Sequence, residues 1–226
     1  MLFRWKDDAT WKRFIPLAND GNVDAIREAL SEFTSFAVYH GCRPGDPMAY
    51  YQDGLKIADL ESLNQRAEQI FLTEEFPSLT RARLEEAIDQ DSKGDDGKLF
   101  AVLDGEYLLE FSPGYLIYGS EHLMRLVNRI SGRGMPYLDV LKRFGIPTLF
   151  EIHIPAHELP QDRFELLASS LFNVCSDRDV DQRPWLNFSF EFQNRLPGDW
   201  IKNHINPEEL VDRLDGCRAY RFKEEK

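Results

Sequence analysis

The chain has 226 residues, of which 42% are hydrophobic, and its 16 phenylalanines can fill a buried core, so the composition excludes a disordered protein. A formal net charge of −12 argues against a protein that binds nucleic acid mainly by charge, although a local basic groove is compatible with it. Three widely separated cysteines, Cys42, Cys175 and Cys217, indicate neither a metal site nor a disulfide framework. The sequence shows neither a signal peptide nor an apolar run long enough to span a membrane, which predicts a cytoplasmic protein without a membrane partner.

The first part of the chain is predicted to be mostly helical around one strand. Apolar residues recur at helical spacing in several segments, and one segment is rich in aromatic and β-branched residues. The expected elements are helices over 23–33, 49–54 and 60–71 and from about Ser78, and a strand over 35–40. No element is assigned to 1–16.

The middle of the chain contains an Asp-Gly pair between two apolar runs. This pair predicts a β-hairpin over 98–111 that turns at Asp104 and Gly105. A short strand is expected from Tyr115 to Tyr118, and Ser120 is expected to cap the helix that follows.

The remaining elements complete a mixed pattern. We expect a buried strand over 147–154, a helix from about Pro160 to Phe172, a polar loop over 175–184, a helical piece over 207–214 and a last strand over 218–222. Strands and helices in this mixed order, with a hairpin, predict an α+β fold.

One strand carries a candidate catalytic carboxylate. Phe188, Phe190 and Phe192 alternate with polar residues, so they predict a strand with one aromatic face. Glu191 lies on the other face, near the strand's end, where it is either held rigidly toward a cleft or exposed on a solvated face.

Three segments stand in a defined order along the chain: His40-Gly41-Cys42-Arg43, then Tyr115 to Ser120 leading into a helix, then Glu191 followed by Leu-Pro-Gly-Asp-Trp-Ile over 196–201. This order resembles the His–Tyr–Glu pattern of the ADP-ribosyltransferase superfamily, in the branch shared by diphtheria-like toxins and poly(ADP-ribose) polymerases. The resemblance covers about residues 36–201. It implies a split β-sheet core with flanking helices in a single domain, 1–226, with an N-terminal helical segment, 1–33, and a catalytic core, 34–226.

The resemblance implies a role for each matching residue. Cleavage of the bond between nicotinamide and ribose leaves positive charge on the ribose, which the Glu191 carboxylate stabilises. His40 is expected to hydrogen-bond the adenosine ribose, Gly41 to offer its backbone to the nicotinamide carboxamide, and Tyr118 to cover the nicotinamide ring, with Tyr115 as its rival. Arg43 is expected to meet the pyrophosphate. The residues expected to contact NAD are His40, Gly41, Cys42, Arg43, Tyr115, Tyr118 and Ser120.

Two positions depart from the family pattern. Cys42 stands where the family usually has Thr or Ser, and Ser189 stands two residues before Glu191, where arginine-modifying toxins carry Glu or Gln. The second departure puts an arginine acceptor in doubt, and mono-ADP-ribosyl transfer is expected. The loop over 176–184 is the candidate for selecting the acceptor.

Four further residues are alternative candidates for a catalytic or metal-binding role. Glu151 also lies on a predicted strand and is the rival catalytic carboxylate. Pro155 prevents the helical spacing that His153 and His157 would need to bind a metal, so no metal is expected. His122 is expected to face solvent.

The resulting function is a mono-ADP-ribosyltransferase that uses NAD as its substrate and modifies a macromolecule, either protein or nucleic acid. Such an enzyme fits a bacterial toxin or a phage-defence effector, with an antitoxin or another regulatory protein as a partner. The alternatives are an NAD hydrolase or an RNA phosphotransferase of the same fold, and a catalytically silent member that binds a partner. The phosphotransferases use a basic pocket, which this acidic chain does not indicate.

Overall fold

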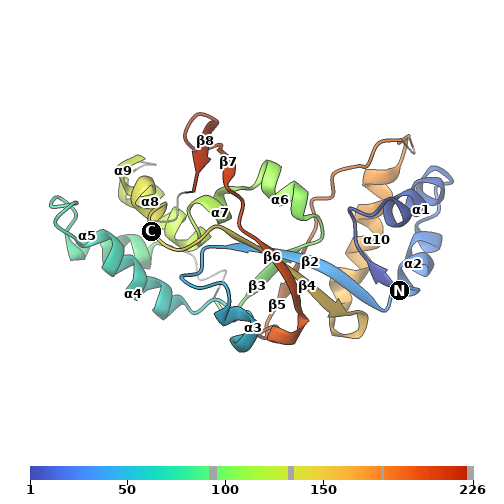
Figure 1. Ribbon diagram of the computed structural model, residues 1–226, viewed down its shortest axis with the longest axis horizontal. Coiled ribbons are helices and arrows are strands. Elements are labelled where there is room, and N and C mark those ends of the chain that lie inside the picture. The colour runs from blue at the N-terminus through green and yellow to red at the C-terminus, as the bar shows by residue number, and fades with distance from the viewer. Residues whose placement is uncertain (92–95, 132–134, 180, 223–226) are drawn as a thin grey trace.

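A computed structural model describes residues 1–91, 96–131, 135–179 and 181–222 of the chain. It is a mixed α+β fold with a largely antiparallel sheet and flanking helices (Figure 1). The strands are β1 (Leu2–Phe3), β2 (Ser35–Cys42), β3 (Leu99–Val102), β4 (Thr148–Pro155), β5 (Ser189–Phe192), β6 (Ile201–Ile205), β7 (Glu209–Asp212) and β8 (Arg218–Arg221). The α-helices are α1 (Asp8–Asn19), α2 (Val23–Ser31), α3 (Ala49–Asp53), α4 (Leu60–Phe71), α5 (Arg81–Asp89), α6 (Gly105–Phe111), α7 (Gly114–Ile117), α8 (Glu121–Ser131), α9 (Met135–Leu141) and α10 (Gln161–Cys175).

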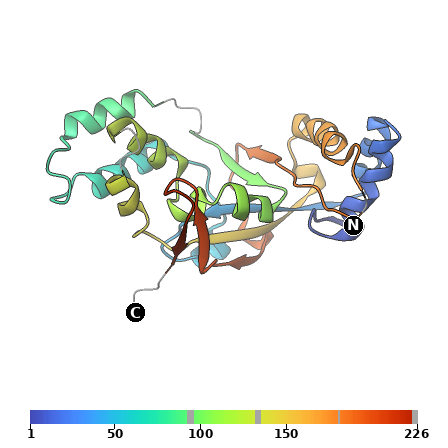
Figure 2. The ribbon, with the colours of Figure 1, turned by 90° about the horizontal axis from the view of Figure 1, so that it is seen from above.

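The main sheet has the order β5-β3-β2-β4-β6, with β1 parallel to the start of β2, while β7 and β8 form a separate pair. Helices α1, α2 and α10 cover one end of the sheet, and α4, α5, α8 and α9 lie at the other end (Figures 1 and 2). In the described part of the chain, no helix has both the length and the apolar character needed to cross a membrane.

The end covered by α1, α2 and α10 is an aromatic core. The ring of Phe36 on β2 lies 5.0 Å from that of Phe3 and 5.8 Å from that of Phe164. Phe14 and Trp5 are buried in the same cluster, so the N-terminal segment, for which no element was predicted, is part of the core that holds the sheet. Burial of several large aromatic side chains against one another favours a rigid arrangement.

The predicted hairpin over 98–111 is wrong in its second half. The segment forms β3 and then helix α6, because Asp104 caps the helix and does not enter a turn. Its carboxylate accepts hydrogen bonds from the backbone N–H groups of Glu106 and Tyr107, and Arg183 neutralises its charge. Aspartate is favoured at turns and at helix N-caps alike, and here the cap is formed.

Two further predicted elements are wrong. The expected strand from Tyr115 to Tyr118 falls on the short helix α7 and its C-cap, and the expected helical piece over 207–214 contains strand β7. The turn between Asp212 and Arg218 joins β7 to β8, whose pairing supplies the backbone hydrogen bonds that a helix would otherwise make. The strands over 35–40, 147–154 and around Glu191 are confirmed.

The sheet divides along one side of β2. Strand β2 pairs with β4 over its full length, from Ser35 to Cys42, but among the described residues its pairing with β3 is limited to Tyr39 opposite Val102. Beyond that point the carbonyl of Phe100 accepts a hydrogen bond from the side chain of His40. The last residues of β2 therefore have β4 on one side and an opening on the other.

Candidate functional site

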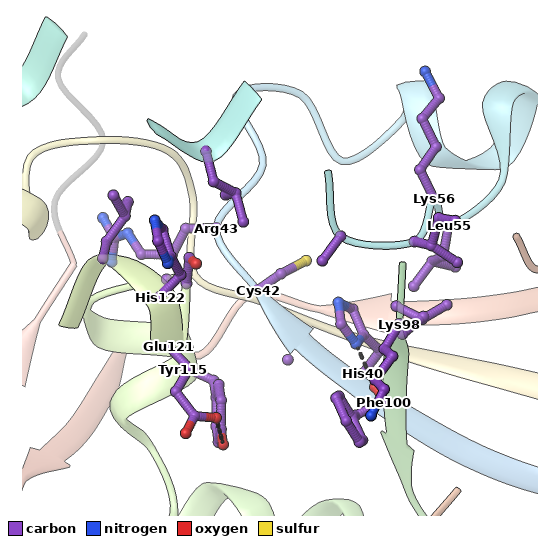
Figure 3. Close-up of a pocket in the computed structure, with 18 of the residues that line it drawn as sticks. His40, Cys42, Arg43, Leu55, Lys56, Lys98, Phe100, Tyr115, Glu121 and His122 are labelled. Atoms are coloured by element: carbon purple, nitrogen blue, oxygen red, sulfur yellow. Dashed lines mark hydrogen bonds between the residues drawn. The ribbon is translucent and has the colours of Figure 1, made fainter. Parts of the chain in front are cut away.

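A cavity of about 840 Å³ occupies this opening between β2 and β3 (Figure 3). Its wall is formed by the end of β2, the segment from α3 to α4, strand β3, and the segment from α6 to the start of α8. The end of α9 with the loop after it, and the start of β5 at Ser189, complete the wall. All seven residues that the sequence predicted to contact NAD line it: His40, Gly41, Cys42, Arg43, Tyr115, Tyr118 and Ser120.

His40 presents a hydrogen-bond acceptor at this wall. Its Nδ1 lies 2.8 Å from the carbonyl oxygen of Phe100, and since a carbonyl only accepts, Nδ1 carries the proton. Burial lowers the pKa of His40, so the ring is neutral and Nε2 keeps its lone pair. A neutral His40 can therefore accept a hydrogen bond from a hydroxyl group of a ligand.

Gly41 and Cys42 contribute packing and a neutral thiol. A Cβ at Gly41 would lie 3.0 Å from Cδ2 of Leu108 on α6, so a larger residue here would require the Leu108 side chain to shift. Burial raises the pKa of Cys42 to about 12, against a weaker opposing effect of its hydrogen bond with Tyr50. Cys42 is therefore protonated at neutral pH and unsuited to act as a nucleophile.

Arg43 lines the cavity but has no N–H left for a ligand. Its guanidinium group is buried and donates five hydrogen bonds, four of them to backbone carbonyls and one to a phenol. The acceptors are the carbonyls of Leu116, Lys142, Phe144 and Gly145 and the hydroxyl of Tyr220. Contrary to the expected direct contact with a pyrophosphate, this side chain ties together the loops behind the cavity.

The two candidate tyrosines differ in exposure. Tyr118 is 2% exposed, and its hydroxyl donates to Asp212 at 2.6 Å. Burial and then this carboxylate raise its pKa. Tyr115 is only partly buried, and its hydroxyl donates to Glu121 at 2.9 Å, on the cavity wall (Figure 3). The environment of Tyr118 is that of a core residue, and Tyr115 is the better placed of the two to cover a ring in the cavity.

Glu191 lies at the rim of the cavity and is absent from its wall. It sits opposite Phe100 in the pairing of β5 with β3 and forms an ion pair with Lys98, which does line the cavity, at 3.3 Å. Strand alternation places Glu191 and His40 on opposite faces of the sheet. Of the expected triad, His40 and Tyr118 meet at one cavity, and Glu191 is one side chain away from it.

Glu191 also borders a second hollow of about 550 Å³. This hollow is polar, and it includes Arg163, Arg195 and Trp200. The Lys98–Glu191 pair therefore stands between the two hollows.

The rival carboxylate Glu151 is part of a structural network. It accepts hydrogen bonds from Arg4 at 2.5 Å and from His153 at 2.8 Å. Burial opposes ionisation, but these two partners outweigh it and lower the pKa of Glu151. Among the described residues that line the cavity, Glu151 does not appear.

His122 and Arg66 are among the wall residues that sequence reasoning missed. His122 was expected to face solvent, but it is 2% exposed and lies between Asp91 at 2.9 Å and Asn64 at 2.8 Å. Its spacing from the buried Leu126, one helical turn along α8, was the available signal. Arg66 on α4 also lines the cavity, and a lone arginine on a polar helix face gives no signal in the sequence.

Comparisons with known proteins assign the chain to no family. No protein-family model matches the chain, and searches of curated proteins and of solved structures found no significant match.

Proposed function

We propose that the protein binds NAD in the cavity between β2 and β3, cleaves the bond between nicotinamide and ribose, and transfers ADP-ribose to a macromolecule. The observation that carries the proposal is that residues drawn from 40–43 and 115–120 line one cavity. The two segments lie far apart in the sequence, and they meet at the cavity although helices α6 and α7 stand where strands were predicted. A volume of about 840 Å³ also lies within the range of pockets that hold small ligands and cofactors.

His40 and Tyr115 are suited to bind different parts of NAD. The Nε2 lone pair of His40 suits a ribose hydroxyl, which donates a hydrogen bond. Tyr115 offers an aromatic face of the kind that stacks on a heterocycle. The two residues lie on different parts of the wall, as contacts with two parts of an elongated dinucleotide require.

Cleavage requires a negative charge near the ribose. When the bond breaks, its electron pair leaves with nicotinamide, and the ribose is left as an oxocarbenium ion that the acceptor's nucleophile attacks. A carboxylate fixed beside this cation stabilises it. Glu191 stands at the rim, next to the second hollow, so in the proposed reaction it exchanges Lys98 for a ribose hydroxyl and borders the path of the acceptor.

The test is incubation of the protein with NAD labelled in its adenylate part and with whole-cell lysate. Labelled macromolecules that are lost on protease digestion identify a protein acceptor, and those lost on nuclease digestion identify a nucleic acid. Nicotinamide release without any labelled macromolecule indicates an NAD hydrolase. No nicotinamide release under any condition contradicts the proposal and indicates a protein that only binds a partner.

A further inference from the structure

Two guanidinium groups at the cavity carry positive charge that no carboxylate balances. Arg43 is 5% exposed, and its five hydrogen-bond acceptors, four carbonyls and one phenol, are all neutral. Arg66 is exposed on α4 and lines the same cavity. Within the described part of the chain, neither side chain forms an ion pair with Asp or Glu. A buried cation without a counter-ion is costly, so this part of the wall attracts an anion.

The two guanidinium groups lie close enough to affect each other. Burial lowers the pKa of Arg43, and the positive charge of Arg66 lowers it further, while a hydrogen bond with Tyr220 opposes both. The same Arg66 charge acts on Tyr50, which borders the cavity beside Cys42. Arg43 and Arg66 therefore both add positive charge to the same part of the cavity wall.

The other cations of this region are already paired. Lys56 has Asp53 at 3.6 Å, Lys98 has Glu191 at 3.3 Å, and Lys142 behind the cavity has Asp212 at 3.0 Å. The positive charge that lacks an ion-pair partner in the described wall is thus concentrated at Arg43 and Arg66.

We propose that Arg66 is the direct ligand of a diphosphate group, and that the buried charge of Arg43 strengthens this anion site from behind. The identity of the ligand as NAD rests on the function proposed above, but the diphosphate chemistry does not, because inorganic pyrophosphate and ADP-ribose share it. Arg66 has the planar donor array that binds phosphate oxygens in pairs, and among the described residues no partner competes for it. The diphosphate then lies on the α4 side of the cavity, across from Tyr115.

The experiment compares Arg66→Ala and Arg66→Lys with the wild type and with Arg218→Ala. Arg218 is an exposed arginine on β8, outside the cavity wall, and serves as the matched control. Each protein is titrated with inorganic pyrophosphate, with ADP-ribose and with nicotinamide riboside, which lacks a diphosphate. Melting curves confirm that the variants are folded, which is expected because Arg66 is exposed.

The expected result is a loss of affinity for pyrophosphate and ADP-ribose of about tenfold to a hundredfold in Arg66→Ala. Arg66→Lys should lose less, and its remaining affinity should fall steeply with added salt. Nicotinamide riboside should bind equally to all four proteins.

Other results are equally informative. Equal diphosphate affinity in wild type and Arg66→Ala overturns the assignment of Arg66 but leaves the proposed function standing if NAD still binds. Binding of pyrophosphate that depends on Arg66, without binding of NAD, supports the anion site and contradicts the function. Failure of the wild type to bind pyrophosphate or ADP-ribose overturns the anion site itself.

Discussion

The two halves of strand β2 differ in what surrounds them. In the first half, Phe36 and Val38 are completely buried against aromatic residues from β1, α1 and α10. In the second half, His40 and Cys42 are only partly buried and line a cavity, because β3 has separated from the strand. Helices lie at both ends of the sheet (Figures 1 and 2), and the two halves of β2 differ in strand pairing and in the side chains around them.

The comparison teaches how a rigid strand can present a site. The aromatic half fixes the position of β2, and pairing with β4 continues through Cys42, so the second half is held in place although one of its sides is open. Mutations should therefore separate residues that hold the strand in place from residues that line its open side.

Phe36→Ala should act on stability alone. Phe36 is fully buried and contacts the rings of Phe3 and Phe164, so its truncation should cost about 3–5 kcal/mol in the free energy of unfolding. Phe36→Leu, which leaves a smaller cavity, should cost less. Denaturant unfolding measures both variants, and NAD titration at low temperature should give the wild-type Kd for the folded protein. A large change in Kd would show that the two halves of β2 are not separable.

Glu191→Gln should act on turnover alone. If the carboxylate stabilises a cationic transition state, its loss costs about a hundredfold to a thousandfold in nicotinamide release and leaves NAD affinity nearly intact. The matched control is Glu151→Gln, which disrupts the network with Arg4 and His153 and should lower the melting temperature while turnover persists. A folded Glu191→Gln protein with near-normal turnover, beside an inactive Glu151→Gln protein, would move the active site to β4.

Mutation of Tyr118 should affect stability, and mutation of Tyr115 should affect NAD binding. Tyr118→Phe leaves the buried carboxylate of Asp212 without one of its donors, so it should cost about 1–3 kcal/mol of stability without changing NAD affinity. Tyr115→Ala removes a partly exposed ring from the cavity and should weaken NAD binding by about fivefold, with little effect on stability. Calorimetric titration and melting curves of both variants check this. The opposite pattern would restore Tyr118 as the residue that covers the nicotinamide.

NAD binding should depend little on pH until the pH falls below the ordinary titration range of histidine. Burial holds the pKa of His40 below 6.5, so Nε2 stays an acceptor as the pH falls to 6.5 and takes up a proton only at lower pH. The free energy of unfolding should change in the same pH range. As the pH falls, His40 takes up its proton in the unfolded chain before it does so in the folded protein. The stabilisation associated with a neutral His40 is therefore present above about pH 6.5 and is lost as the pH falls toward the folded pKa. NAD titrations between pH 8 and pH 5 measure the effect. A half-maximal loss of affinity at pH 6.5 or above would contradict it.

The sequence was sufficient to predict three strands of the main sheet and seven of the residues that line the cavity. Aromatic and β-branched residues over 35–40, the apolar run over 147–154 and the alternation around Glu191 predicted three strands, which the structure contains as β2, β4 and β5. Prediction failed between Asp104 and Tyr118, where an N-cap replaces a turn and a short helix replaces a strand, since aspartate and tyrosine are compatible with both. The structural role of Arg43 could not be predicted from the sequence either, because its five hydrogen-bond acceptors lie more than seventy residues away along the chain.

The central claim is that the opening between β2 and β3 binds NAD. Equilibrium titration of NAD into the wild type, His40→Ala and His157→Ala tests it most directly, because His157 is an exposed histidine outside the cavity. The account predicts saturable binding to the wild type, an affinity about three- to tenfold lower in His40→Ala because one hydrogen bond is lost, and no change in His157→Ala. Absence of saturable binding to the wild type, or the same Kd in all three folded proteins, would contradict the account.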